Sequence, residues 1–158
     1  MPYHLREATL TDVDTLTFQR IAMFTDMGRT FDTGGVERAF REWLRVQMTA
    51  GVYRAWLVED AGTRAAVAGG GLSILPWPPG PGYMVDRLAF VYNVWVDPSH
   101  RRQGLARRVM ETIHEFCRAN GIRSVALNAS EDGRPLYESL GYQVTPSPMM
   151  FFAVASDQ

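Results

Sequence analysis

Residues 92–106 read YNVWVDPSHRRQGLA, and this stretch decides how the rest of the chain is interpreted. The β-branched and aromatic start, residues 92–96, predicts a strand that a proline-containing turn ends. A helix is expected to begin near Arg101 and to run to about Asn120. The order of strand, short loop and helix presents several consecutive backbone N–H groups at a helix N-terminus, where the helix dipole favours phosphate. The stretch therefore predicts an anion-binding loop.

The charge and size of the loop residues agree with that interpretation. Gly104 and Ala106 are small enough to let a diphosphate approach the backbone. Positive charge surrounds them, from Arg101, Arg102, Arg107 and Arg108. A solvated basic helix start is an alternative that charge alone leaves open. Neither the Rossmann glycine fingerprint nor the Gly-Lys-Ser/Thr of a P-loop is present.

Length and composition indicate one domain, because 158 residues can bury about two-thirds of the unfolded surface. Hydrophobic residues make up 46% of the chain, charged residues 21%, and the formal net charge is -1. These values argue against disorder and against nucleic acid as a partner. No apolar run approaches the roughly 18 residues of a membrane span and no signal core is seen, so we expect a soluble, cytoplasmic protein without a membrane partner. The single cysteine, Cys117, fits a reducing compartment, and the three histidines have no metal-ligand spacing.

The remaining elements alternate between helix and strand. Before the central stretch, the patterns predict a strand over residues 3–8, helices over 12–27 and 36–48, and strands over 53–59 and 65–75. After it, they predict a strand over residues 124–128, a short helix over 135–140, and a last strand or hairpin over 143–145 and 149–154. The strand-helix-strand unit should be parallel. The whole predicts an α/β (α+β) fold with a mixed central sheet and about four helices.

Three local features have more than one interpretation. Arg20 interrupts the apolar stripe of the first helix, where it either extends to solvent or faces a substrate. The glycines at residues 69–71 suggest a bulge or the close approach of another backbone. The proline-rich residues 76–82 form a stiff loop, either a spacer or a specificity element. For the first helix, Thr11 and Asp14 are the expected capping residues.

Two motifs resemble those of the GNAT superfamily of N-acetyltransferases. The run Val94-Trp95-Val96-Asp97-Pro98 followed by Arg101-x-x-Gly104-x-Ala106 is similar to the superfamily's acyl-CoA motif, and residues 133–142, GRPLYESLGY, are similar to its last motif. The order of elements matches over residues 3–154. The resemblance implies one N-acetyltransferase domain over residues 1–158, with the sheet splayed at a bulge in the central strand.

The resemblance also implies acetyl-CoA as cosubstrate, with its pantetheine arm in the gap between the splayed strands. A bulge leaves backbone groups unpaired, so it suits a ligand that behaves like an added strand. The implied cofactor-binding residues are Val94, Trp95, Val96, Arg101, Arg102, Gln103, Gly104, Leu105, Ala106, Arg107, Asn128 and Ser130. Ser130 stands where many relatives carry an asparagine, and it or Asn128 could instead cap the short helix. Asn93 is expected beside the bulge, touching the acceptor or, more simply, satisfying broken ladder groups.

The implied activity is direct transfer of an acetyl group to a primary amine in a ternary complex. An alkyl ammonium with a pKa of about 10.4 is free base in only about one molecule in a thousand at neutral pH, so a proton must be removed. The departing thiolate gains from an acid, a role that the resemblance gives to Tyr137, whose alternative is packing against the sheet. Candidate bases are Glu59, Asp26, Asp132 and Glu131, and none is chosen. Cys117 on the apolar stripe does not suggest a covalent route.

The acceptor is expected to be a small-molecule or peptide amine, and a homodimer is left open. Aromatic residues in the region expected to hold it argue against a highly cationic acceptor: Phe24, Phe31, Trp43, Trp77 and Tyr83. A function from another class remains open as well, a catalytically silent acyl-CoA-binding sensor or scaffold. The missing base favours that alternative, and Tyr137 favours the enzyme.

Overall fold

A mixed five-stranded sheet is the centre of the fold in the computed structural model, which describes residues 2–82 and 84–155. Its strands are β1 (Tyr3–Glu7), β2 (Tyr53–Asp60), β3 (Ala66–Pro76), β4 (Arg87–Val96) and β5 (Val125–Leu127). They lie in the order β1-β2-β3-β4-β5, antiparallel up to β4, with β4 and β5 parallel. The α/β class and the parallel pairing predicted from the sequence are confirmed.

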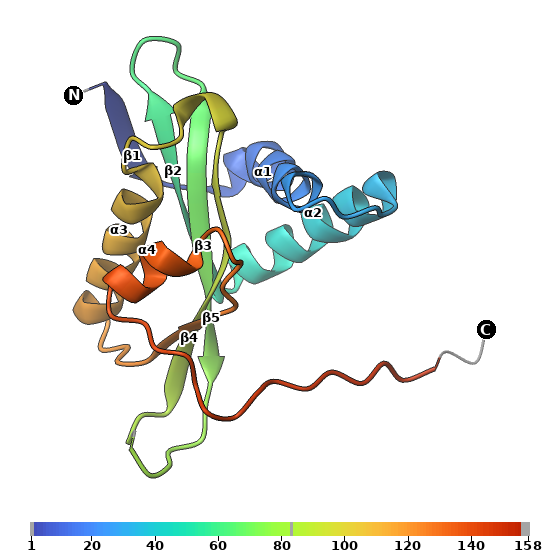
Figure 1. Cartoon of the computed structure of the whole chain (residues 1–158). Helices are drawn as coiled ribbons and strands as arrows, with labels where there is room; N and C mark the ends of the chain where they lie inside the picture. The colour runs from blue at the N-terminus through green and yellow to red at the C-terminus, as the bar shows by residue number, and fades with distance from the viewer. Residues whose placement is uncertain (1, 83, 156–158) are drawn as a thin grey trace. The chain divides into compact units, whose positions relative to one another are not determined.

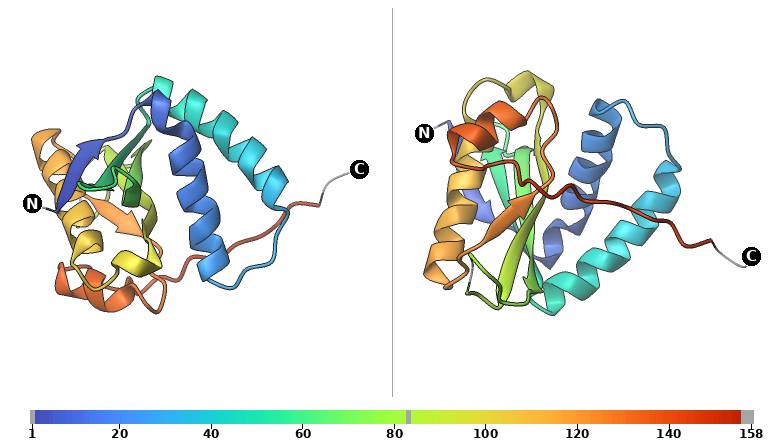
Figure 2. Two further views of the ribbon diagram at one scale, coloured as in Figure 1. Left: turned by 90° about the horizontal axis from the view of Figure 1, so that it is seen from above. Right: turned by 60° about the horizontal axis from the view of Figure 1, so that its bottom comes forward.

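The helices are α1 (Val13–Asp26), α2 (Thr33–Thr49), α3 (Leu105–Ala119) and α4 (Arg134–Ser139), with the short 3-10 helices η1 (Leu10–Asp12) and η2 (Pro98–His100). The chain divides into two compact units, Met1–Asn128 with the sheet and α1 to α3, and Ala129–Gln158 with α4. Within the first unit, α1 and α2 lie on one face of the sheet and α3 lies on the other (Figures 1 and 2). Tyr83, named above among the aromatic residues, lies outside the described residues.

Some element boundaries differ from the expected ones for clear chemical reasons. The capping box forms at Thr9 and Asp12 and begins η1, rather than at the expected Thr11 and Asp14. Helix α2 begins before the expected residue 36, because the Asp32 carboxylate accepts the N–H of Gly35 at 3.0 Å and caps it.

The expected last strand or hairpin is wrong. Residues 143–145 and 149–154 are not in a strand. Two prolines in this segment, Pro146 and Pro148, have no N–H to donate to a ladder, so strand pairing would be interrupted there.

Three consecutive glycines of β3, residues 69–71, allow unusually close packing on both faces of the sheet. A Cβ on the first would collide with the Gln19 side chain of α1, and one on the third would collide with the Tyr53 ring. A Cβ on the middle glycine would lie 2.9 Å from Cγ1 of Val109 in α3. Side chains from both faces therefore rest directly on bare backbone, which explains why the glycines stand here.

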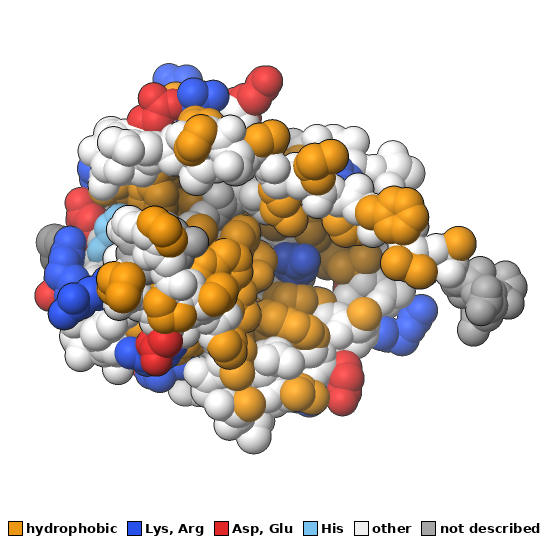
Figure 3. Space-filling view, turned by 90° about the horizontal axis from the view of Figure 1, so that it is seen from below, with side chains coloured by type: hydrophobic (Ala, Val, Ile, Leu, Met, Phe, Trp, Pro, Cys, Tyr) orange, Lys and Arg blue, Asp and Glu red, His pale blue; other side chains and the backbone are white. Residues whose placement is uncertain are grey.

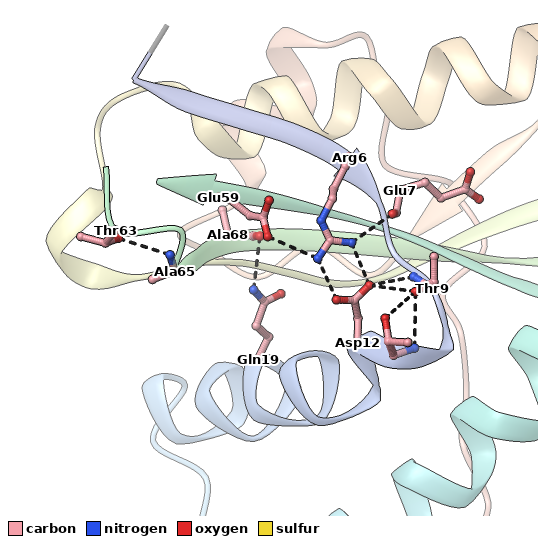
Figure 4. A network of polar contacts seen from close by, with 10 residues as sticks. Arg6, Glu7, Thr9, Asp12, Gln19, Glu59, Thr63, Ala65 and Ala68 are labelled. Atoms are coloured by element: carbon pink, nitrogen blue, oxygen red, sulfur yellow. Dashed lines mark hydrogen bonds and ion pairs between the residues drawn. The ribbon is translucent and has the colours of Figure 1, made fainter. Parts of the chain in front are cut away.

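An ion-pair network joins β1 to the start of α1 (Figure 4). Arg6 donates from both terminal nitrogens to the two Asp12 carboxylate oxygens, each at 2.8 Å, and lies 3.3 Å from Glu59 Oε2. Asp12 also accepts the N–H of Thr9 at 2.8 Å. The hydrogen bonds from Arg6 hold the pKa of Asp12 below its ordinary value. The network fixes the first helix to the sheet edge.

Candidate functional site

Strand β4 carries a bulge whose conformation is fixed by side chains. Two of its residues, Asn93 and Val94, lie opposite the single Gly70 of β3. Asn93 is in the left-handed region, with φ 64°. Its Nδ2 donates to the Tyr53 hydroxyl at 2.8 Å, and its Oδ1 accepts from Arg20 Nη1 at 2.5 Å. The predicted bulge is confirmed, but the Asn93 amide bonds to side chains instead of the broken ladder groups that the simpler interpretation favoured.

Tyr53 is a site residue that sequence reasoning did not identify. Its side chain is fully buried at the start of β2, and burial raises its pKa to about 12, so the phenol is neutral at physiological pH. The neutral hydroxyl accepts the hydrogen bond from Asn93 that fixes the bulge. A tyrosine that opens a strand is common, and no spacing in the sequence relates residue 53 to residue 93.

The splay of the sheet leaves one edge of β4 unpaired. Strand β5 pairs with β4 only at residues 89–91, so β4 runs on past it through Val94, Trp95 and Val96. The Trp95 side chain is buried and its Nε1 donates to Asp26 at 2.9 Å. What β4 offers on this edge is therefore backbone N–H and C=O groups, the groups that an extended ligand would pair with.

The loop after β4 is held in place at two points. Arg101 donates from Nη2 to Asp26 at 2.8 Å and from Nε to the Val96 carbonyl at 3.0 Å. Gln103 accepts at Oε1 from the Tyr3 hydroxyl at 2.8 Å. The side chains of Arg101 and Gln103 are thus engaged with the protein itself, and they shape the loop.

The N-terminus of α3 is open to a ligand. Two residues with positive φ, Arg102 (64°) and Gly104 (76°), turn the backbone into the helix, and no side chain of residues 2–82 or 84–155 caps it. A Cβ placed on Gly104 would find no atom within 4 Å. The first turn presents the N–H groups of Leu105 and Ala106, which a helix N-terminus leaves without a partner inside the helix. This arrangement could hold a diphosphate at the positive end of the helix dipole.

The other expected site residues lie at the end of the first unit and in the second. Asn128 is exposed after β5. Ser130 accepts at Oγ the N–H of Gly133 at 3.1 Å, so it closes the turn before α4. Tyr137 lies on α4 in edge-to-face contact with Tyr142, and burial raises the pKa of its phenol. Its proton is therefore retained at neutral pH, as an acid needs.

The candidate bases have ordinary structural explanations. Asp26 accepts hydrogen bonds from both Trp95 and Arg101. Glu59 is ion-paired with Arg6 (Figure 4). Glu131 and Asp132 are exposed in the second unit. The structure therefore brings Asp26 to the site as an anchor of the loop, and it gives no reason to choose a base among these four.

Other features of the described residues offer no competing site. A shallow hollow of about 470 Å³ lies at the C-terminal end of α3, and Cys117 in its lining is buried with its pKa raised by burial. Within residues 2–82 and 84–155 no three His, Cys, Asp or Glu residues group as metal ligands, and no helix there is long and apolar enough to cross a membrane. Hydrophobic side chains (orange) gather on the face drawn in Figure 3 with few acidic ones (red) among them.

Comparison with known proteins agrees with this geometry. The model of the acetyltransferase (GNAT) family matches residues 20–142. A solved structure of a GCN5-related N-acetyltransferase from Ralstonia eutropha JMP134 is 31% identical, with a TM-score of 0.85 over 95% of this chain and 98% of that one. A predicted acetyltransferase from Clostridium acetobutylicum, solved with acetyl-CoA, has a TM-score of 0.87 over 95% of this chain and 96% of that one. At 20% identity, this second likeness is one of fold.

Named relatives match over shorter stretches. Glucosamine 6-phosphate N-acetyltransferase from Trypanosoma brucei brucei is 38% identical over 53 residues, 34% of this chain and 36% of that protein. N-acetyltransferase 8 from Homo sapiens is 33% identical over 58 residues, 35% of this chain and 26% of that protein. The matched region is well under two-thirds of either relative.

Proposed function

The chain belongs to the acetyltransferase (GNAT) family, and from this premise we propose that it transfers an acetyl group from acetyl-CoA to a primary amine by direct attack in a ternary complex. The observation that carries the proposal is the unpaired edge of β4, which runs from the bulge at Asn93 to the uncapped N-terminus of α3. We further propose that residues 1–158 act together as one N-acetyltransferase domain in the cytoplasm.

The proposed cofactor site has two parts that fit acetyl-CoA. The backbone of Val94, Trp95 and Val96 would pair with the pantetheine arm, because no strand of the described residues pairs with them on the β5 side, although the Val96 carbonyl also accepts from Arg101 Nε. Beyond them lies the diphosphate part, for which the open first turn of α3 and the positive φ at Gly104 are the support. Its proposed contacts are Arg101, Arg102, Gln103, Gly104, Leu105, Ala106 and Arg107, with Asn128 and Ser130 as further contacts. Because Arg101 and Gln103 are engaged elsewhere, their part would be to shape the loop.

The transfer needs two proton movements that residues or solvent must provide. Acetyl-CoA supplies an activated thioester, whose C–S bond breaks as the C–N bond to the amine forms. Tyr137 would donate its phenolic proton to the departing sulfur, and its raised pKa supports the proposal because the proton is present throughout the neutral range. The amine proton leaves to a base, and the engagement of Asp26 and Glu59 in other contacts supports solvent as its route.

That same engagement favours a second candidate function. With Asp26 and Glu59 held in other contacts, the chain could bind acyl-CoA and act as a sensor or scaffold without turnover. An acceptor screen that follows release of free thiol with a chromogenic reagent separates the two functions. We expect thiol release with at least one small-molecule or peptide amine, and acetyl-CoA binding without any release would leave the sensor as the function.

A further inference from the structure

Arg20 is held in an aromatic environment next to the bulge. It lies on α1, with its guanidinium carbon 4.8 Å from the Phe24 ring centroid and 4.9 Å from that of Phe40 in α2. The two rings restrict the orientation of the guanidinium and provide cation-π attraction. The side chain is half-buried, so its position is set by packing.

The charge of Arg20 has no counter-ion within the described residues. Its hydrogen bond goes to the Asn93 side-chain amide, and among residues 2–82 and 84–155 no carboxylate oxygen lies within 4.0 Å of it. Burial lowers the pKa of Arg20, opposed only by the phenols of Tyr53 and Tyr92. Other arginines do have carboxylate partners: Arg6, Arg41, Arg54, Arg87, Arg101, Arg118 and Arg134. A partly desolvated cation without an anion is unfavourable unless something else pairs with it.

The unused donors of Arg20 are accessible. A guanidinium has five N–H groups, and the Asn93 contact uses Nη1. Nε and Nη2 of Arg20 have no hydrogen-bond partner in the described part of the chain. Every buried side-chain nitrogen in that part has a partner, so these two nitrogens are not buried. Solvent therefore reaches Nε and Nη2, and these two nitrogens form the side of a guanidinium that binds a carboxylate or phosphate with two parallel hydrogen bonds.

The position of Arg20 suits contact with the acceptor better than contact with the cofactor phosphates. The proposed diphosphate part lies at the start of α3, and α3 covers the opposite face of the sheet from α1 and α2 (Figure 2). Arg20 is on the α1 face, bonded to the bulge residue that precedes Val94. An amine that reaches the bulge from this face would pass the guanidinium.

We infer that Arg20 binds an oxyanion of the acceptor, so that the substrate is an amine that also carries a carboxylate or a phosphomonoester. This inference rests on the proposed function, because it concerns that reaction's acceptor. The contacts with the Phe24 and Phe40 rings position the guanidinium that binds the oxyanion, and the bulge held by Asn93 sets the distance from it to the reacting amine. Substrate selection is then made by a charge that the fold leaves unpaired.

Matched amine pairs test the inference. β-Alanine and β-alaninamide differ in the carboxylate, and O-phosphoethanolamine and ethanolamine differ in the phosphate. We expect calorimetry to show that wild-type protein binds the anionic member of at least one pair at least about 10-fold more tightly than the neutral member. A difference of this size is typical of two charge-assisted hydrogen bonds. The KM values should show the same preference. The pair that shows the preference identifies the oxyanion.

Two variants separate recognition from a structural role. Arg20→Met should weaken binding of the preferred anionic amine about 10- to 100-fold while leaving the neutral member within about 2-fold, and Arg20→Lys should recover part of it. Arg29→Met is the matched control, since Arg29 also stacks on Phe24, at 5.2 Å, but is exposed and far less confined. Its effect should be under about 2-fold.

Several results would overturn the inference. They are equal binding of both members of each pair by wild-type protein, no binding of either anionic amine, or equal weakening of both members by Arg20→Met, which would mean that Arg20 only braces the bulge. Calorimetry measures binding without turnover, so it tests whether Arg20 binds an oxyanion even if no amine causes thiol release. Failure of the proposed function would show in the thiol assay alone.

Discussion

Arg101 Nη2 lies 2.8 Å from the Asp26 carboxylate, and this contact ties the loop after β4 to the C-terminal turn of α1. The same carboxylate oxygen accepts the Trp95 indole N–H at 2.9 Å. The strand that would receive the thioester and the loop that would receive the diphosphate thus share one anchor, located on the helix that also carries Arg20.

Asp26→Asn should lower the free energy of unfolding by about 1 kcal/mol, because it removes the charge from a half-exposed ion pair and weakens one hydrogen bond. Urea denaturation measures the change. The matched control is Glu115→Gln, which breaks an exposed pair with Arg118 at 3.0 Å and should change stability by no more than a few tenths of a kcal/mol. Equal effects would mean that Asp26 is an ordinary surface carboxylate.

Gly104→Glu should abolish acetyl-CoA binding measured by calorimetry, because it places a negative side chain at the open N-terminus of α3. Gly104→Ala separates backbone strain from charge: φ is 76° and a Cβ meets no atom within 4 Å, so only a loss of about 1 kcal/mol in stability is expected. Gly121→Glu is the control at the other end of α3, with φ 68° and the same strain. If Gly104→Glu binds acetyl-CoA with unchanged affinity, the diphosphate does not bind at the N-terminus of α3.

Tyr137→Phe should lower kcat about 100-fold or more while leaving the Kd for acetyl-CoA within about 2-fold, because only the proton donor is lost. The ring contact with Tyr142 is kept in phenylalanine, so stability should not change greatly. Tyr142→Phe, which alters the neighbouring hydroxyl instead, is the control. A variant with wild-type kcat would show that another group or solvent protonates the sulfur.

Stability should fall steeply at alkaline pH because of Tyr53. Its folded pKa is about 12, above the value of about 10 in the unfolded chain, so between these pH values the folded state binds more protons and each rise in pH favours unfolding. The full effect is on the order of 3 kcal/mol. Denaturant titrations from pH 8 to 11.5 measure the slope, which should be shallower in Tyr53→Phe. Equal slopes would mean that the phenol ionises without unfolding the protein.

Asp12→Asn should destabilise the fold by about 2 kcal/mol at neutral pH, since it leaves the half-buried Arg6 with one carboxylate, that of Glu59 at 3.3 Å, beside its hydrogen bond to the Glu7 carbonyl. The pKa of Asp12 is lowered in the fold, so its contribution is present above the ordinary carboxyl range and is lost as pH falls through the folded pKa. The variant should therefore lose less stability in acid than the wild type. Asp14→Asn, at an exposed pair with Arg41, should show neither effect.

The sequence predicted the parts of this molecule that depend on local pattern. The crossover from β4 through α3 to β5 was expected from the order of strand and helix, whereas the bulge in the central strand was implied by the resemblance to the GNAT superfamily. Contacts between distant residues could not be predicted, because nothing in the sequence relates Tyr53 to Asn93 or Asp26 to Arg101. Arg20 was noticed because it interrupts an apolar stripe, but the rings that confine it come from α1 and α2 together. The expected final strand or hairpin is wrong because Pro146 and Pro148 interrupt any backbone ladder there.

The glycines of β3 also couple the two faces of the sheet mechanically. At most positions in a sheet, a side chain on each face can change rotamer and absorb a small displacement of the layer above it. Residues 69–71 have no side chain that could adjust in this way, since Val109 on one face and Tyr53 on the other pack directly on the backbone of consecutive glycines. Any displacement of α3 would therefore be transmitted through the backbone of β3 toward Tyr53, whose hydroxyl accepts the hydrogen bond from Asn93.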